Sequence, residues 1–163
     1  MEMMRGVLCL VCGLCIWPAM ADTTIVSPDR SLKVVFVETV RSQATRAKEF
    51  VLKIRDKRGN EVFAKDYTSG DGEHGSSLLN AKWTPDSQYL VYASTSSGGH
   101  QSWRIPIHVY ARKRNEVVDL EQIVGDIVDD QFRIVAPHTV IVTSRDANTL
   151  QPKDVTLNLS KIK

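Results

Sequence analysis

The chain has 163 residues, and its 21 lysine and arginine side chains against 19 aspartate and glutamate side chains give a formal net charge of +2. These charges are interspersed, apart from the basic run at 112–114, which excludes a broad basic face for nucleic acid. All three cysteines lie within residues 1–21. Residues 22–163 therefore contain no disulfide, thiol nucleophile or cysteine-ligated metal, and they are numerous enough to rely on a hydrophobic core.

Residues 1–21 have the pattern of a cleaved signal peptide. Arg5 supplies a short positive start, residues 6–17 form an uncharged run, and Ala19-Met20-Ala21 is a small-x-small cleavage site. A membrane anchor would need about 20 apolar residues, and Pro18 ends this run earlier. We therefore expect export, to the periplasm or outside the cell, with no stable membrane insertion after cleavage. The lack of later cysteines favours a bacterial envelope.

Alternating apolar residues dominate the rest of the chain, and no segment keeps helical periodicity for three turns. Polar loops are expected at 67–77 and 95–102, and one helical turn at 120–124. Pro106 has no N–H to donate, so we expect it at a sheet edge or a bulge. The predicted strands are 32–38, 49–56, 61–66, 78–83, 88–94, 103–111, 116–120, 131–136, 139–144 and 154–160. The strand 88–94 is apolar in both phases and should be covered on both faces. This series of short strands predicts an all-β fold.

The chain also repeats itself, which indicates similar units placed side by side. Ser27-Pro28-Asp29 and Thr84-Pro85-Asp86 each precede an apolar strand, a loop, a second strand, a basic turn and a strand that opens with Asn-Glu-Val. A weaker third copy begins at Ala136-Pro137-His138. We expect residues 22–163 to form a single all-β domain of repeated units, at about 27–66, 78–124 and 131–163.

The run Trp83-Thr84-Pro85-Asp86-Ser87 with the strand after it resembles the PD40 repeat of TolB-type β-propellers, and 27–31 resembles a copy without the tryptophan. Proline presets the backbone for a turn, and the aspartate accepts from backbone N–H groups at the corner. Propellers have about 4–8 blades, whereas this chain has material for two to three blade-like units. The resemblance therefore implies antiparallel sheets in an incomplete propeller-like stack or sandwich. In that family the repeat is a scaffold for binding proteins and the gating domain of some peptidases, so it implies no reaction.

Stacking of like units should place the loops 39–47, 95–102 and 144–152 at one edge, opposite the Pro-Asp corners. His74 and His100, with carboxylates nearby, form a possible Zn²⁺ or Mn²⁺ ligand set, although such glycine-rich loops are ordinarily solvent-facing turns. The candidate ligand- or partner-binding residues at this edge are Asp71, Glu73, His74, Ser97, His100 and Trp103.

Three functions remain open from the sequence. The first is an exported, non-enzymatic module that binds another envelope protein through its loop edge or an open sheet edge. The second is a small metal-binding protein or metal-dependent hydrolase that uses the loops of His74 and His100. The third is a module that binds cell-wall glycans on Trp103. For both Trp83 and Trp103, however, a place in the core is favoured over a role as a ligand platform.

Nucleophilic catalysis has no support in the sequence, and we expect no cofactor. There is no G-x-S-x-G motif, and the serines of 94–97 are placed in a flexible run. His108 alternates with apolar residues in a predicted strand and is interpreted as an exposed or hydrogen-bonded sheet residue. The oligomeric state stays open.

Overall fold

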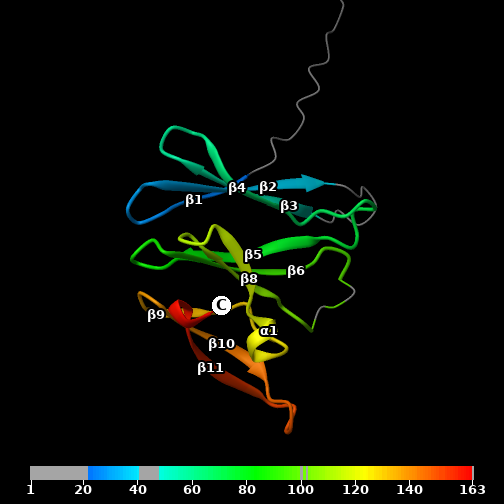
Figure 1. Ribbon diagram of the computed structural model, residues 1–163. Helices are drawn as coiled ribbons and strands as arrows, with labels where there is room; N and C mark the ends of the chain where they lie inside the picture. Colours follow the sequence, from blue (N-terminus) through cyan, green and yellow to red (C-terminus); the bar gives the residue numbers. More distant parts are fainter. Residues whose placement is uncertain (1–21, 41–47, 100, 102, 163) are drawn as a thin grey trace, which may run out of the picture.

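The computed structural model describes residues 22–40, 48–99, 101 and 103–162 of the chain. It is all-β, and three antiparallel sheets lie on one another in the order of the sequence (Figure 1). The first sheet has the order β1-β2-β3-β4, the second β5-β6-β7-β8 and the third β11-β10-β9. The predicted fold class, antiparallel sheets in blade-like units, is confirmed.

Each sheet is built from strands that are consecutive in the chain. The first contains β1 (Thr23–Val26), β2 (Leu32–Val40), β3 (Lys48–Asp56) and β4 (Glu61–Asp66). The second contains β5 (Ser76–Trp83), β6 (Tyr89–Ser96), β7 (Ile107–Ala111) and β8 (Glu116–Asp119). The third contains β9 (Arg133–Ala136), β10 (Thr139–Arg145) and β11 (Pro152–Asn158). A helical turn, α1 (Glu121–Val124), follows β8, and a 3-10 turn, η1 (Leu159–Lys161), follows β11.

Beyond shifts of up to two residues at strand ends, one predicted strand is shorter in the structure and one observed strand was not predicted. The strand expected at 103–111 begins only at Ile107, because the Arg104 N–H bonds the Gln101 carbonyl in a turn before it. Pro106 therefore lies in the loop, where its carbonyl accepts from the Ser94 N–H, and the edge or bulge expected for it was wrong. Strand β1 was missed because four residues are too few to show a period.

The second sheet carries a hydrophobic core on each of its faces. Along β6, Leu90 and Tyr92 pack with the first sheet, whereas Val91 and Ala93 pack with the third, and all four are fully buried. This confirms that β6 is covered on both faces. The first core is formed by Leu32, Val34, Phe36, Phe50, Leu52, Ile54, Trp83, Leu90, Tyr92 and Tyr110. The second is formed by Val91, Ala93, Ile107, Val109, Leu120, Ile127, Phe132, Val140, Val142, Leu159 and Ile162.

The first Pro-Asp corner joins β1 to β2 through local hydrogen bonds. The Ser27 hydroxyl donates to the Asp29 carboxylate at 2.6 Å and accepts from the Leu32 N–H at 3.0 Å. The same carboxylate accepts from the Ser31 N–H at 3.0 Å. Arg30 has φ 56°, in the left-handed region that lets so short a turn reverse the chain.

The second corner, between β5 and β6, repeats these bonds. The Thr84 hydroxyl donates to Asp86 at 2.6 Å and accepts from the Tyr89 N–H at 3.0 Å. Ser87 takes the left-handed conformation with φ 62°. The shared geometry explains why the motif needs a hydroxyl before the proline and an aspartate after it.

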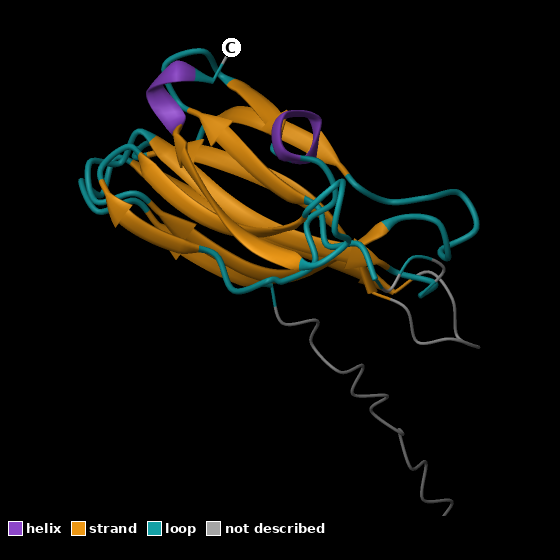
Figure 2. Ribbon diagram, turned by 90° about the horizontal axis from the view of Figure 1, so that it is seen from below, coloured by secondary structure: helices purple, strands orange, loops and turns teal. Residues whose placement is uncertain are grey.

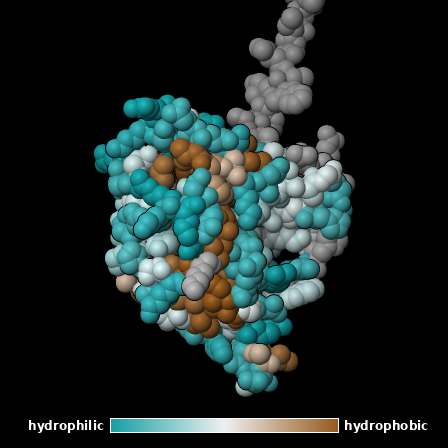
Figure 3. All heavy atoms as spheres, in the orientation of Figure 1, coloured by the Kyte–Doolittle hydropathy of each residue, from teal (hydrophilic) through white to brown (hydrophobic). Residues whose placement is uncertain are grey.

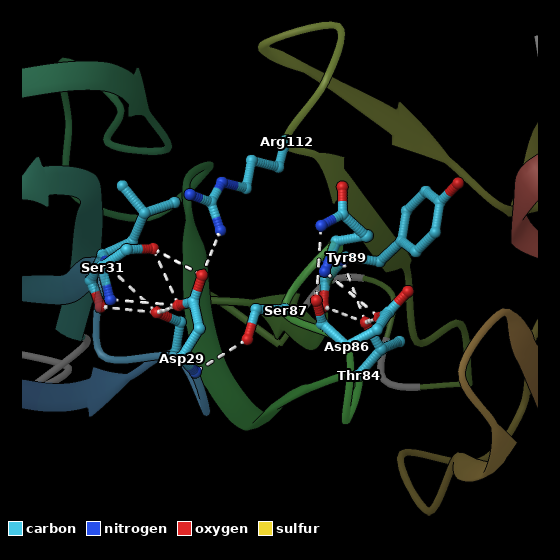
Figure 4. Close-up of polar contacts among 10 residues, drawn as sticks. Asp29, Ser31, Thr84, Asp86, Ser87, Tyr89 and Arg112 are labelled. Atoms are coloured by element: carbon cyan, nitrogen blue, oxygen red, sulfur yellow. Dashed lines mark hydrogen bonds and ion pairs between the residues drawn. The ribbon is translucent and has the colours of Figure 1, made fainter.

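The corners contact one another and so link the sheets. The Asp29 N–H donates to the Ser87 hydroxyl at 3.0 Å, and Arg112 pairs with the Asp29 carboxylate at 2.7 Å (Figure 4). The Ser27 hydroxyl and the Arg112 guanidinium hold the pKa of Asp29 well below its ordinary range. His138, in the aspartate position of the third corner, lies 3.2 Å from Asp86. All three corners therefore meet at one end of the stack.

The outer face of the third sheet carries a polar cluster. Thr143 is the fifth residue of β10, and the fifth residues of β2 and β6 are Phe36 and Ala93. Its hydroxyl donates to Asp154 at 3.1 Å, and Asp154 also pairs with Arg133 at 2.7 Å. At this position a hydrogen-bonded cluster therefore stands where the other two sheets present an apolar side chain to the next sheet.

Candidate interaction edge

Among the described residues the third sheet has three strands, whereas each of the other two has four. Strand β4 pairs antiparallel with β3, and β8 pairs antiparallel with β7. Strand β11 is the equivalent of β3 and β7 in the third sheet. On its outer side no strand is paired within the described part of the chain.

The bonds at both ends of the β10–β11 hairpin show which backbone groups face outwards. The Leu159 N–H donates to the His138 carbonyl, and the Asp146 N–H donates to the Gln151 carbonyl. Hydrogen-bonded pairs alternate along an antiparallel ladder. Residues 153, 155 and 157 therefore bond β10, whereas residues 154, 156 and 158 direct their N–H and C=O groups to the open side. Thr156 lies at the middle of this edge.

A hollow of about 460 Å³ lies directly beside the open edge. Three of its six lining side chains are apolar, apolar atoms make up most of its surface, and Ile123 from α1 is 47% exposed. The hollow is lined by Ile123, Thr156, Leu157, Asn158, Lys161 and Ile162. On the face shown in Figure 3, hydrophobic residues form a stripe that runs from the first sheet to the third and is bordered by hydrophilic ones. An edge strand with one open side beside this hollow is a surface suited to an added strand.

The loop edge predicted from the repeats lies at the end opposite the corners. Figure 2, seen along the stack, shows the turns gathered at two opposite ends of the sheets. Ser97 lies beside the loop before β5, where its N–H donates to the Gly75 carbonyl at 3.0 Å. Most of loop 39–47, at residues 41–47, and also His100 lie outside the described residues.

The loop before β5 is folded around the carboxylate of Glu49, which is fully buried. Ser69 donates both its N–H and its hydroxyl at 2.7 Å, and Gly75 N–H and the Ser97 hydroxyl each donate at 2.8 Å. Burial alone would raise the pKa of Glu49, but these donors outweigh it and hold the pKa below its ordinary value. A side chain at Gly75 would lie 2.4 Å from this carboxyl group. Ser97 is thus held by a carboxylate that the sequence patterns did not single out.

The other candidate residues of this loop form a local cluster. Asp71 and His74 lie 2.5 Å apart. The Glu73 N–H, the Ser69 hydroxyl and His74 hold the pKa of Asp71 well below its ordinary range. Among the described residues, no group of three or more His, Cys, Asp or Glu side chains is placed to hold a metal ion. The metal hypothesis also required His100, so its full ligand set is not described.

The two expected core tryptophans lie in different environments. Trp83 is buried in the first core and meets Tyr110 edge to face, as expected. Trp103 is 58% exposed, so the expectation that it belongs to the core was wrong. Trp103 lies between the polar loop and β7. The chain is not a strand there, so its side chains do not alternate between two faces of a sheet.

Ser94 lies inside β6. The expectation that it belongs to a flexible run was wrong. Its hydroxyl lies 3.0 Å from His108 Nε2, and His108 Nδ1 lies 2.5 Å from Asp119. The hydrogen bond from His108 holds the pKa of Asp119 below its ordinary value. Ser94 is only 1% exposed, so its hydroxyl is closed to a substrate. The three side chains connect β6, β7 and β8, and the expected role of His108 as a hydrogen-bonded sheet residue is confirmed.

No model of a known protein family matches this sequence, and no curated protein matches it. Solved structures with a similar arrangement include puromycin hydrolase, with 14% identity over 84% of this chain and 20% of that chain and a TM-score of 0.46. A putative dipeptidyl aminopeptidase IV from Bacteroides ovatus has 12% identity over 84% of this chain and 22% of that chain, with a TM-score of 0.46. The tricorn protease has 12% identity over 85% and 21% of the chains, with a TM-score of 0.32. The chain spans about a fifth of the length of each, and the likeness is one of fold: a propeller-like β module.

Proposed function

We propose that this chain is an exported, non-enzymatic module that binds another envelope protein through the outer side of β11. The observation that carries the proposal is the open edge of β11 beside the apolar hollow, in a chain whose other two sheets both have a fourth strand. The signal-peptide pattern of residues 1–21 supports export. No helix within the described ranges is long and apolar enough to cross a bilayer.

The physical gain from an added strand has two parts. The outward N–H and C=O groups of β11 would form hydrogen bonds with the added strand in place of water. The apolar surface of the hollow would be buried at the same time. Proteins usually protect such edges with very short strands, bulges or a covering element. Strand β11 has seven residues and pairs with β10 over its whole length without a register shift. It is therefore a preformed template for strand addition.

Replacement of Thr156 by proline tests the proposal, because its N–H faces the open side. Proline is tolerated at such an edge position and removes only the outward donor. We expect Thr156→Pro to change the free energy of unfolding by less than about 1 kcal/mol, and to lose the partner that the wild-type protein retains from envelope extract.

Thr156→Val is the matched control, since valine keeps the N–H and a β-branched side chain. It should retain the partner, as measured by quantitative mass spectrometry of the captured proteins, with folding checked by circular dichroism. Retention of the same partner by folded Thr156→Pro at the wild-type level would show that the open edge is not the binding site.

A further inference from the structure

We infer that the partner segment proposed to add at β11 runs antiparallel to it and carries an acidic residue opposite Asn158, followed by an aliphatic residue opposite Leu157. This inference rests on the proposed function, because it specifies what binds at the same edge. It comes from the fourth strands that the chain itself supplies to its first two sheets.

Those two fourth strands begin alike. Strand β4 opens with Glu61-Val62 and β8 with Glu116-Val117. Strand β8 has a regular register on β7, without the shift found between β3 and β4. It is therefore the better template for a segment on β11.

The register of the third sheet places each residue of such a segment. Ala111 and Asn158 occupy the same position, since each pairs with the first residue of the strand after a corner. Glu116 lies opposite Ala111, so the acidic residue of the segment lies opposite Asn158. The second residue then lies opposite Leu157, as Val117 lies opposite Tyr110.

The second position must be aliphatic because of the surface it would cover. Residues directly opposite in a ladder place their side chains on the same face. Leu157 packs against the second core and also lines the hollow. An aliphatic side chain opposite Leu157 would therefore enter the space beside Ile123 and Ile162. The third residue would lie opposite Thr156, on the polar outer face, and a polar residue such as threonine suits it.

The first position must be acidic because of the charges around it. In the native sheets, Glu61 pairs with Lys53 at 3.5 Å and Glu116 pairs with Arg114 at 2.5 Å. At β11, Lys161 lines the hollow near the end of the strand where an antiparallel segment would begin. Within the part of the chain that the structure describes, Lys161 forms no ion pair. A carboxylate at the start of the segment would complement it.

Nuclear magnetic resonance titration of the ¹⁵N-labelled protein with three peptides tests the inference. The probe is Asn-Glu-Val-Thr-Asp-Leu, the chain's own 115–120 sequence with threonine in the position of Val118. The second peptide opens Asn-Lys-Val, and the third opens Asn-Glu-Asn. We expect the probe to shift the backbone amides of residues 154, 156 and 158, the second peptide to bind about fivefold more weakly, and the third to bind below detection.

Lys161→Glu is the matched charge reversal and should invert the preference, so that the Asn-Lys-Val peptide binds about fivefold more tightly than the probe. Equal binding of both peptides to both proteins, or no binding of the probe, would overturn the inference. If Thr156→Pro still loses the envelope partner in that case, the proposed function stands without this pattern. If ultracentrifugation shows dimers that Thr156→Pro abolishes, the occupant is a second copy and the inference is wrong.

Discussion

At the scale of single residues, Glu49 decides the shape of the loop before β5. A buried carboxylate costs several kcal/mol unless donors satisfy it. Here Ser69, Gly75 and Ser97 provide them from two separate loops. The partners lie between 20 and 48 residues away in sequence, so no local pattern could reveal them. The loop edge was predictable from the repeat order, but the residue that fixes it was not.

Glu49→Gln tests this role. The amide keeps the volume of the side chain but loses the charge and one acceptor, so the N–H and hydroxyl donors around it lose strong bonds. We expect the free energy of unfolding to fall by about 2 kcal/mol, measured by urea denaturation. Glu61→Gln, at an exposed position with an ion pair of 3.5 Å, should change it by less than about 0.5 kcal/mol. Equal effects of the two variants would contradict the role assigned to Glu49.

The same residue should make stability depend on pH. Its folded-state pKa lies below the ordinary value, so the unfolded chain binds a proton first as the pH falls. Its contribution is complete above the unfolded pKa of about 4.3 and is lost as the pH falls through the lower folded pKa. Between about pH 5 and 3, the wild-type protein should therefore lose stability more steeply than Glu49→Gln. Parallel urea curves for both proteins across this range check the difference.

At the scale of elements, the corners show what a local pattern can predict. Their hydroxyl, carboxylate and N–H partners lie within five residues of one another, and the sequence therefore revealed both turns and the strands after them. The start of β7 was not predicted, since Trp103 and Ile105 continue an apolar pattern into a loop. The three strands of the third unit were predicted, but their order in the sheet was not, because a strand pattern does not show which neighbour pairs with it. The order of strands in the sheet is a long-range property.

Thr84→Val tests the second corner. Valine preserves the shape of the side chain but removes a fully buried hydroxyl that donates to Asp86 and accepts from the Tyr89 N–H. The cost should be about 2 kcal/mol, because the Tyr89 N–H loses its partner. Thr84→Ser keeps the hydroxyl and should cost less than about 1 kcal/mol. Thermal and urea denaturation measure both, and an equal loss in both variants would assign the cost to packing.

At the scale of the whole molecule, the second sheet is shared by two cores. Leu90 and Tyr92 belong to the first core, and Val91 and Ala93 to the second, although they alternate along one strand. Neither core can lose its packing without exposing one face of β6. We therefore expect the three sheets to unfold in one transition. Repeat arrays whose units are less tightly coupled unfold unit by unit instead.

Phe50→Ala tests this coupling from the first sheet. Phe50 is fully buried and meets Phe36 edge to face at 5.5 Å, so the truncation should cost about 3–5 kcal/mol. The loss should appear equally in tryptophan fluorescence, which senses Trp83 in the first core, and in far-ultraviolet circular dichroism of all three sheets. Two separate transitions in the variant would show that the first sheet unfolds independently.

The polar outer face of the third sheet has a consequence for assembly. With Thr143, Asp154 and Arg133 bonded across it, a sheet stacked on this face would have to bury hydrogen-bonded polar groups, which costs free energy. An extended segment added at the side of β11, as proposed, would leave these bonded groups in water. The proposed strand addition therefore predicts complexes of one-to-one composition rather than fibres built by the stacking of sheets.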